Sequence, residues 1–149
     1  MKPLLFVALI ALAPALLAEQ KQPTAPTPTP LPVTSRSRAL ELAGAFANDG
    51  YKIRDGFWAG SLELGKPLFV EVNLFSGNEY WFSSAALPPA HKIAVDVFDQ
   101  KGRPVQGERF QDGATAAAGL IAQTSGHYFV RVTMTEGEKA DFCLVYSYK

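Results

Sequence analysis

The chain has 149 residues, and its 14 lysines and arginines equal its 14 aspartates and glutamates. This balance excludes the strongly basic surface that attracts nucleic acid or anionic lipid, so neither is expected as a partner. Frequent glycine (12) and proline (11), together with segments rich in valine, phenylalanine and tyrosine, favour an all-β fold with many turns.

Residues 1–18 have the pattern of a secretory signal peptide. Lys2 gives a positive start, residues 3–17 are almost wholly apolar, and cleavage is expected after Ala18 or, alternatively, after Ala15. The apolar run is short and a polar, proline-rich tract follows it, which favours a signal peptide over the alternative, an uncleaved membrane anchor. We therefore expect an exported protein, in the periplasm, at the cell surface or outside the cell, with no membrane span after cleavage.

Residues 19–36 are rich in proline and threonine and form the predicted linker. Prolines at positions 23, 26, 28, 30 and 32 favour an extended polyproline II conformation and prevent a packed core. A spacer or an O-glycosylated stalk is one interpretation of this composition, and an exported tail without a selected function is the other.

A short helix is predicted at residues 37–49, at the start of a folded domain that covers residues 37–149. Apolar residues recur there at the spacing of one helix face, namely Ala39, Leu42, Ala43 and Phe46. Ser35 or Ser37 is available as the N-cap, and the Asn-Asp-Gly sequence at residues 48–50 is a typical stop. This helix is expected to pack against one end or edge of the sheets.

The rest of the domain has the pattern of β-strands separated by turns. The expected strands cover residues 57–64, 68–74, 80–82, 93–98, 104–110, 114–123, 125–134 and 140–148, and the alanine-rich segment 114–123 has a helix as its alternative. Seven or eight short strands with regular turns predict an antiparallel β-sandwich, jelly-roll or immunoglobulin-like, with one short N-terminal helix.

Two details of this sandwich also follow from the sequence. The brief connection at residues 135–139 favours antiparallel neighbours on its two sides. The last strand is apolar on both faces, so it is expected at the centre of a sheet. It contains Cys143, the only cysteine, which excludes an internal disulfide and is expected to be a small buried apolar residue.

The order of these strands and turns is similar to that of a known bacterial family. The residues that carry the similarity are 60–62, 68–74, 76–82, 95–102, 124–132 and 142–144. They resemble the pre-peptidase C-terminal (PPC-like) domain, a secreted β-sandwich module. The resemblance implies an appendage that aids secretion, stability or attachment, in a family with collagen-binding and carbohydrate-associated members. Segment 48–55 lacks the acidic-proline-asparagine opening with which some members hold calcium, so neither a metal nor another cofactor is expected.

No catalytic residue is predicted. The two histidines, His91 and His127, lie in a proline-rich loop and immediately after a turn, without sequence cues for the activated nucleophile that a hydrolytic triad needs. The sequence also lacks spacings typical of metal ligands. We therefore expect a non-enzymatic protein, and a small secreted hydrolase or enzyme inhibitor is the alternative.

Large aromatic residues form the predicted ligand-binding site. If the aliphatic residues of segment 68–74 point inward, Phe69 points outward, and the same argument places Trp81 and Phe98 on outer faces, with Trp58 as a further large ring. Such rings stack on sugars or receive a partner segment, so the expected function is binding or structural, with an envelope protein or a polysaccharide as partner. The alternative is that the helix or loops cover these rings as a second small core. No pattern indicates an oligomeric state.

Overall fold

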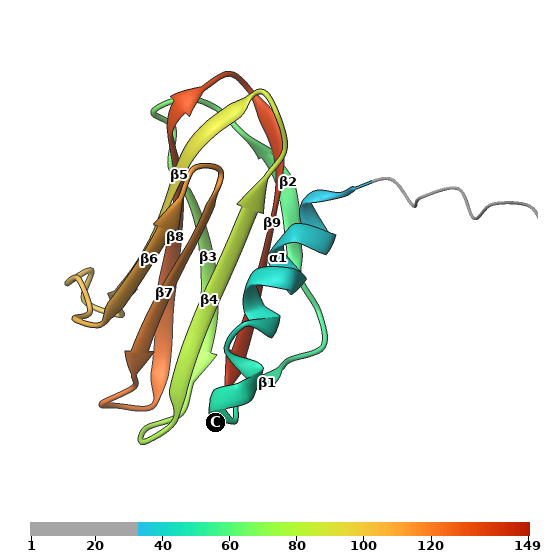
Figure 1. Cartoon of the computed structure of the whole chain (residues 1–149). Helices are drawn as coiled ribbons and strands as arrows, with labels where there is room; N and C mark the ends of the chain where they lie inside the picture. The colour runs from blue at the N-terminus through green and yellow to red at the C-terminus, as the bar shows by residue number, and fades with distance from the viewer. Residues whose placement is uncertain (1–32) are drawn as a thin grey trace, which may run out of the picture. The chain divides into compact units, whose positions relative to one another are not determined.

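The computed structural model describes residues 33–149, so the predicted signal peptide and the linker up to residue 32 lie outside the described residues. The described part contains an α-helix, a short 3-10 helix and nine strands (Figure 1). In chain order these are α1 (Ser35–Gly44), η1 (Ala47–Asp49), β1 (Lys52–Ile53), β2 (Trp58–Leu62), β3 (Leu68–Leu74), β4 (Glu79–Ala86), β5 (Ala90–Asp99), β6 (Glu108–Asp112), β7 (Thr115–Ile121), β8 (Gly126–Gly137) and β9 (Ala140–Tyr148). The predicted all-β class with one N-terminal helix is confirmed.

The strands form two antiparallel sheets that pack face to face as a sandwich. The larger sheet has the order β1-β9-β4-β7-β6, with β2 also pairing with β9, and the smaller sheet has the order β3-β8-β5. Strands β8 and β9 follow each other in the chain but lie in different sheets. The prediction that residues 135–139 join antiparallel neighbours is therefore wrong, because this turn carries the chain across the sandwich.

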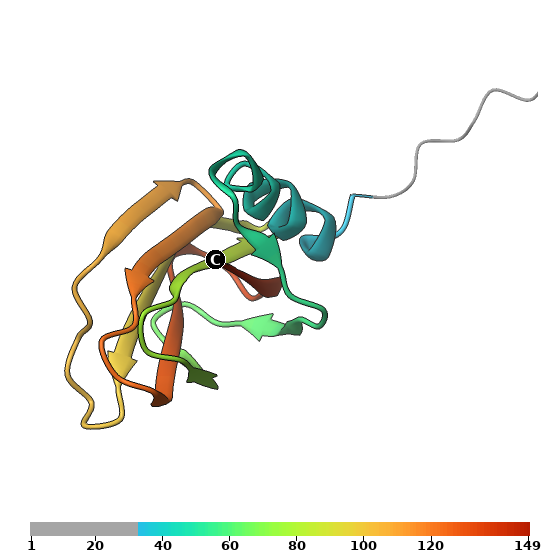
Figure 2. The same ribbon diagram turned by 90° about the horizontal axis from the view of Figure 1, so that it is seen from below.

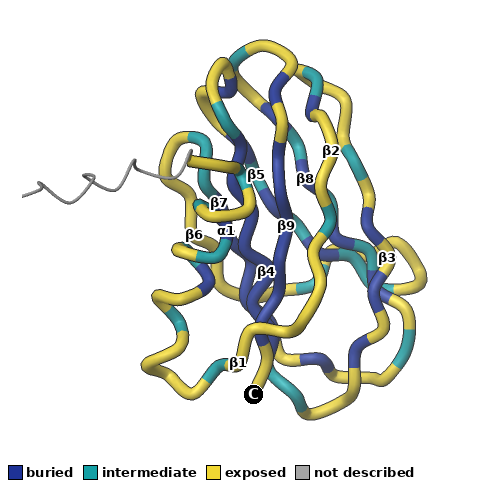
Figure 3. The backbone as a smooth tube through the Cα atoms, turned by 90° about the vertical axis from the view of Figure 1, so that its right-hand side faces the viewer, coloured by how far each residue is buried: buried dark blue, intermediate teal, exposed yellow. Residues whose placement is uncertain are grey.

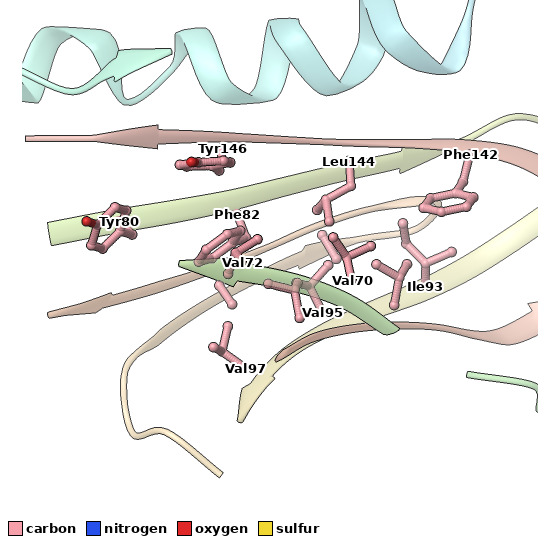
Figure 4. Close-up of a cluster of buried hydrophobic side chains, with 14 of the residues drawn as sticks. Val70, Val72, Tyr80, Phe82, Ile93, Val95, Val97, Phe142, Leu144 and Tyr146 are labelled. Atoms are coloured by element: carbon pink, nitrogen blue, oxygen red, sulfur yellow. The ribbon is translucent and has the colours of Figure 1, made fainter. Parts of the chain in front are cut away.

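One face of each sheet contributes to a shared apolar core. The buried residues of β8 are those that the alternation predicts to face inward, Tyr128, Val130, Val132 and Met134. Strands β4 and β9 are buried on both faces along most of their length (Figure 3), which confirms the central position of the last strand. Figure 4 shows Ile93 and Phe142 toward one end of the core and Tyr80 and Tyr146 toward the other.

Helix α1 begins two residues earlier than predicted, because Thr34 is its N-cap. The Thr34 hydroxyl accepts a hydrogen bond from the Ser37 backbone N–H (3.1 Å), and the Ser37 hydroxyl accepts one from the Thr34 N–H (3.0 Å). This reciprocal pair is a capping box, which satisfies donors at the helix start. The cap is therefore Thr34, and neither Ser35 nor Ser37 has that role.

Helix α1 covers the outer face of the larger sheet (Figure 2), so the prediction that it packs against one end or edge of the sheets is wrong. Ala39 and Ala43 on the helix pack against Ala85 of β4 and against Cys143 and Val145 of β9. The small side chains let the helix approach the strands closely, which explains its alanine-rich face. Cys143 is fully buried in this second cluster, so its prediction as a small apolar residue is confirmed.

Segment 114–123 contains the strand β7, so its helical alternative is wrong. β7 pairs with β4 on one side and with β6 on the other, and these ladders outweigh the helix propensity of its alanines. Two other differences are smaller. Strand β6 begins at Glu108, later than the predicted start at residue 104, and the two-residue strand β1 has no predicted counterpart.

Candidate functional site

Trp81 is buried on the outer face of the larger sheet, with only 8% of its surface exposed. The Phe46 ring stacks on it with centroids 4.1 Å apart and planes 9° from parallel. Its other face lies against Gly119, its cross-strand partner on β7. Both faces of the indole are therefore covered, and neither is left for a ligand. For Trp81 the structure supports the alternative given above, that the helical region covers the ring, here through the segment that follows α1.

Phe69 and Phe98 lie together on the outer face of the smaller sheet, which α1 does not cover. Their ring centroids are 6.4 Å apart, and 55% of Phe69 is exposed. The Arg131 guanidinium lies 4.8 Å above the Phe98 ring and donates a hydrogen bond of 2.8 Å to the Asp96 carboxylate. This surface is aromatic and accessible, and the Asp96 carboxylate is shared between Arg131 and, at 3.8 Å, Arg109.

Trp58 lies on β2, away from the other three predicted residues. It is partly buried, and its ring stacks on Tyr146 of β9 with centroids 5.9 Å apart. The structure therefore brings Phe69 and Phe98 together, but it separates this pair from Trp58 and from the covered Trp81.

The main concave feature near these rings is a groove between the edges of the two sheets. It consists of two depressions of about 330 and 400 Å³, which share Arg54, Asn73 and Tyr146 as lining residues. One wall comes from the segment around β1 and β2 and the other from β3, which lie along the same side of the domain (Figure 3). We call these two depressions together the inter-sheet groove.

Aromatic residues line the groove at both ends. Phe57 and Trp58 line the larger depression, and Phe75 and Tyr148 line the smaller one. The hydroxyl of Tyr80, which closes this end of the core (Figure 4), accepts hydrogen bonds from the Phe75 backbone N–H (2.9 Å) and from the Asn78 side chain (3.3 Å). Tyrosine side chains from this end of the core therefore reach the surface in the groove, with their hydroxyl groups outward.

Arg54 is the central cation of the groove. Its backbone N–H donates to the Tyr146 carbonyl (3.0 Å), which fixes the segment beside β9. Its guanidinium donates to the Tyr146 hydroxyl and lies 5.4 Å from the centroid of the same ring. Within residues 33–149 no carboxylate lies within salt-bridge distance of this guanidinium.

The two depressions differ in charge. Among the residues that the structure describes, Arg54 is the only charged one that lines the smaller depression. The larger one adds the carboxylates of Asp55 and Glu71, and Glu71 is paired with His127 on the neighbouring strand. Anionic groups are therefore favoured at one end of the groove and hydrogen-bond donors at the other.

Sequence reasoning missed most of this groove. Arg54, Asn73 and Tyr146 come from three separate segments, and no local pattern links them. Trp58 was a signal, since a large ring close in sequence to Arg54 lies in the same wall.

Within residues 33–149, neither histidine is hydrogen-bonded to a serine, threonine or cysteine that could act as a nucleophile. His127 pairs with Glu71, and His91 is exposed at the start of β5. Within the same residues, no three side chains of histidine, cysteine, aspartate or glutamate gather as metal ligands would. The only α-helix described, α1, is too short to cross a membrane.

Comparison with known proteins adds no assignment to this geometry. No family model matches the chain, and no curated protein matches it.

Proposed function

We propose that this protein is an exported, non-catalytic β-sandwich module of the PPC-like kind, which recognises a glycan or a protein at the envelope or outside the cell. The observation that carries the proposal is the inter-sheet groove, in which an arginine with no acidic partner among residues 33–149 is set between aromatic walls. Ligand sites typically combine a concave surface of about 300–1,000 Å³, aromatic lining and a few convergent polar groups. Each depression of the groove reaches the lower end of that range.

The groove is favoured over the Phe69–Phe98 surface for two reasons. Arg131 on that surface has an acidic partner, Asp96, which it shares with Arg109. Arg54 has no such partner among the described residues, and the groove shelters a ligand on two sides. Recognition therefore centres on Arg54 and Trp58.

A small secreted hydrolase is the second candidate, because Asp55 and Glu71 line the same depression and glycoside hydrolysis uses two carboxylates. The ion pair between Glu71 and His127 favours a carboxylate that holds structure or a ligand instead. We expect no release of reducing ends from polysaccharides incubated with the protein. If the wild type releases reducing ends and a Glu71→Gln variant does not, hydrolysis would replace binding as the proposed function.

The test of the binding proposal is capture of envelope proteins and immobilised polysaccharides by the exported protein. Trp58→Ala is expected to lose the captured partner, because it removes one wall of the groove. Phe69→Ala is the matched control, since it removes an exposed ring on the outer face of the smaller sheet that does not line the groove. Capture that is absent for the wild type, or equal for wild type and Trp58→Ala, would contradict recognition at the groove.

A further inference from the structure

The geometry points to a narrower ligand class: we propose that the inter-sheet groove binds an acidic oligosaccharide, with a uronic-acid carboxylate at Arg54 and a neutral sugar ring beside Trp58. This inference rests on the proposed function and deepens it. It assigns different chemistry to the two ends of the groove.

The first step of the argument is the charge of the smaller depression. Arg54 is its only charged lining residue, and the guanidinium has no salt bridge within residues 33–149. A guanidinium carries five N–H donors in a planar fork, and Tyr146 takes only a part of them. That fork matches a carboxylate in two parallel hydrogen bonds, which is the strongest pairing available to it.

The second step is the polar lining around that cation. Asn73 and Asn78 each present an amide with both a donor and an acceptor, and tyrosine hydroxyls lie beside them. Vicinal sugar hydroxyls need this mixture of donors and acceptors. An extended peptide at the free edge of β3 would instead be held mainly by main-chain hydrogen bonds, which do not use these amide and hydroxyl groups.

The third step is the opposite end of the groove. There Asp55 and Glu71 repel a second carboxylate but accept hydrogen bonds from hydroxyls. The Arg36 guanidinium lies 4.4 Å from the Phe57 ring centroid and Tyr146 stacks on Trp58, so each ring offers its remaining surface to the apolar side of a sugar. Strand β9 connects the two ends, because Trp58 pairs with Leu144 and Lys52 pairs with Tyr148. Four residues of a strand span about 13 Å, which exceeds one sugar ring and fits a short oligosaccharide.

The experiment is titration calorimetry on the whole exported protein. The probes are short oligosaccharides from pectate, alginate and hyaluronan, each with a counterpart in which the carboxylate is reduced to a primary alcohol, and a tri-glutamate peptide. We expect at least one acidic oligosaccharide to bind about tenfold or more tightly than its reduced counterpart, and more tightly than the peptide. The affinity should fall as salt is raised, because an exposed cation is screened.

Two variants locate the interaction. Arg54→Gln is expected to weaken binding of the acidic oligosaccharide about tenfold or more and to weaken binding of the reduced one by a much smaller factor. Lys101→Gln, which removes a cation from the distant β5–β6 connection, is the matched control and should change neither. Far-ultraviolet circular dichroism is the check that Arg54→Gln is folded. Arg54→Lys keeps the positive charge but loses the planar guanidinium, so it should retain only part of the affinity.

The outcomes separate this inference from the proposed function. Equal binding of acidic and reduced oligosaccharides would overturn the acidic class but keep glycan recognition. If tri-glutamate binds more tightly than every oligosaccharide, an acidic peptide would replace the acidic glycan as the proposed ligand. Binding of no probe at all would overturn the inference, and recognition of another partner would then rest on the capture experiment. Undiminished binding by Arg54→Gln would also overturn it.

Discussion

Replacement of Gly119 by alanine tests how the helical segment is held on the sandwich. A β-carbon at Gly119 would lie 2.6 to 2.9 Å from three atoms of the Trp81 ring. Carbon atoms pack best at about 3.5–4.0 Å, so the indole would have to move by about 1 Å. The Phe46 ring, stacked at 4.1 Å on the other face, blocks that movement. We expect Gly119→Ala to lower the free energy of unfolding by about 1–3 kcal/mol, as overpacking does.

The assay is urea unfolding of four proteins that form a double-mutant cycle: wild type, Gly119→Ala, Phe46→Ala and the double variant. Removing the Phe46 ring gives the indole room, so the penalty of Gly119→Ala should shrink by about 1 kcal/mol in that background. Gly60→Ala is the control, because its β-carbon would make an ordinary contact, 3.5 Å from Phe142. It should change stability by less than about 0.5 kcal/mol.

Two results would refute this reasoning. A Gly119→Ala variant as stable as the wild type would mean that the indole is not clamped between the strand and the Phe46 ring. An equal loss with and without Phe46 would mean that the ring does not restrain Trp81, and the helical segment would then be held by the alanine contacts of α1 alone.

Three further predictions concern the cap, the cysteine and acid stability. Thr34→Ala should lower the free energy of unfolding by about 1 kcal/mol in urea, because the Ser37 N–H loses its acceptor. Burial raises the pKa of the Cys143 thiol, so a disulfide reagent should react with it at least about a hundredfold more slowly in the native protein than in denaturant; equal rates would contradict its burial. The hydrogen bond from Tyr51, with help from Lys149, holds the pKa of the Glu79 carboxyl below its usual value of 4.5. The stability from Glu79 is therefore present above that value and lost as the pH falls through the lowered pKa, so the melting temperature of Tyr51→Phe should decline less between pH 5 and 3 than that of the wild type.

Much of the fold was predictable because strand residues alternate between faces. In β3 and β8, parity along the chain alone separates inward valines from outward Phe69 and Arg131, and the structure agrees. For Trp81 the same rule correctly placed the ring on the outer face of its sheet. It carries no information about whether another element covers that face, so it did not predict the burial of the ring.

The candidate site was predictable only in part. Trp58 was recognised by its size, whereas Arg54 stood out in no pattern. The residues that give the groove its chemistry are far apart in sequence, and the hydrogen bond from Arg54 to Tyr146 spans 92 positions. Phe69 and Phe98 were predicted as part of one aromatic set, but they lie on the smaller sheet and Trp58 lies on the larger.

The local order of residues was sufficient to establish the β-class, the short helix and the inward side of each long strand, because these depend on periodicity. Long-range packing decided the rest. It placed β8 and β9 in different sheets, covered Trp81 with Phe46, and set Arg54 beside Tyr146 in an open groove. Periodicity constrains each segment separately, whereas a groove exists only where the edges of two sheets meet.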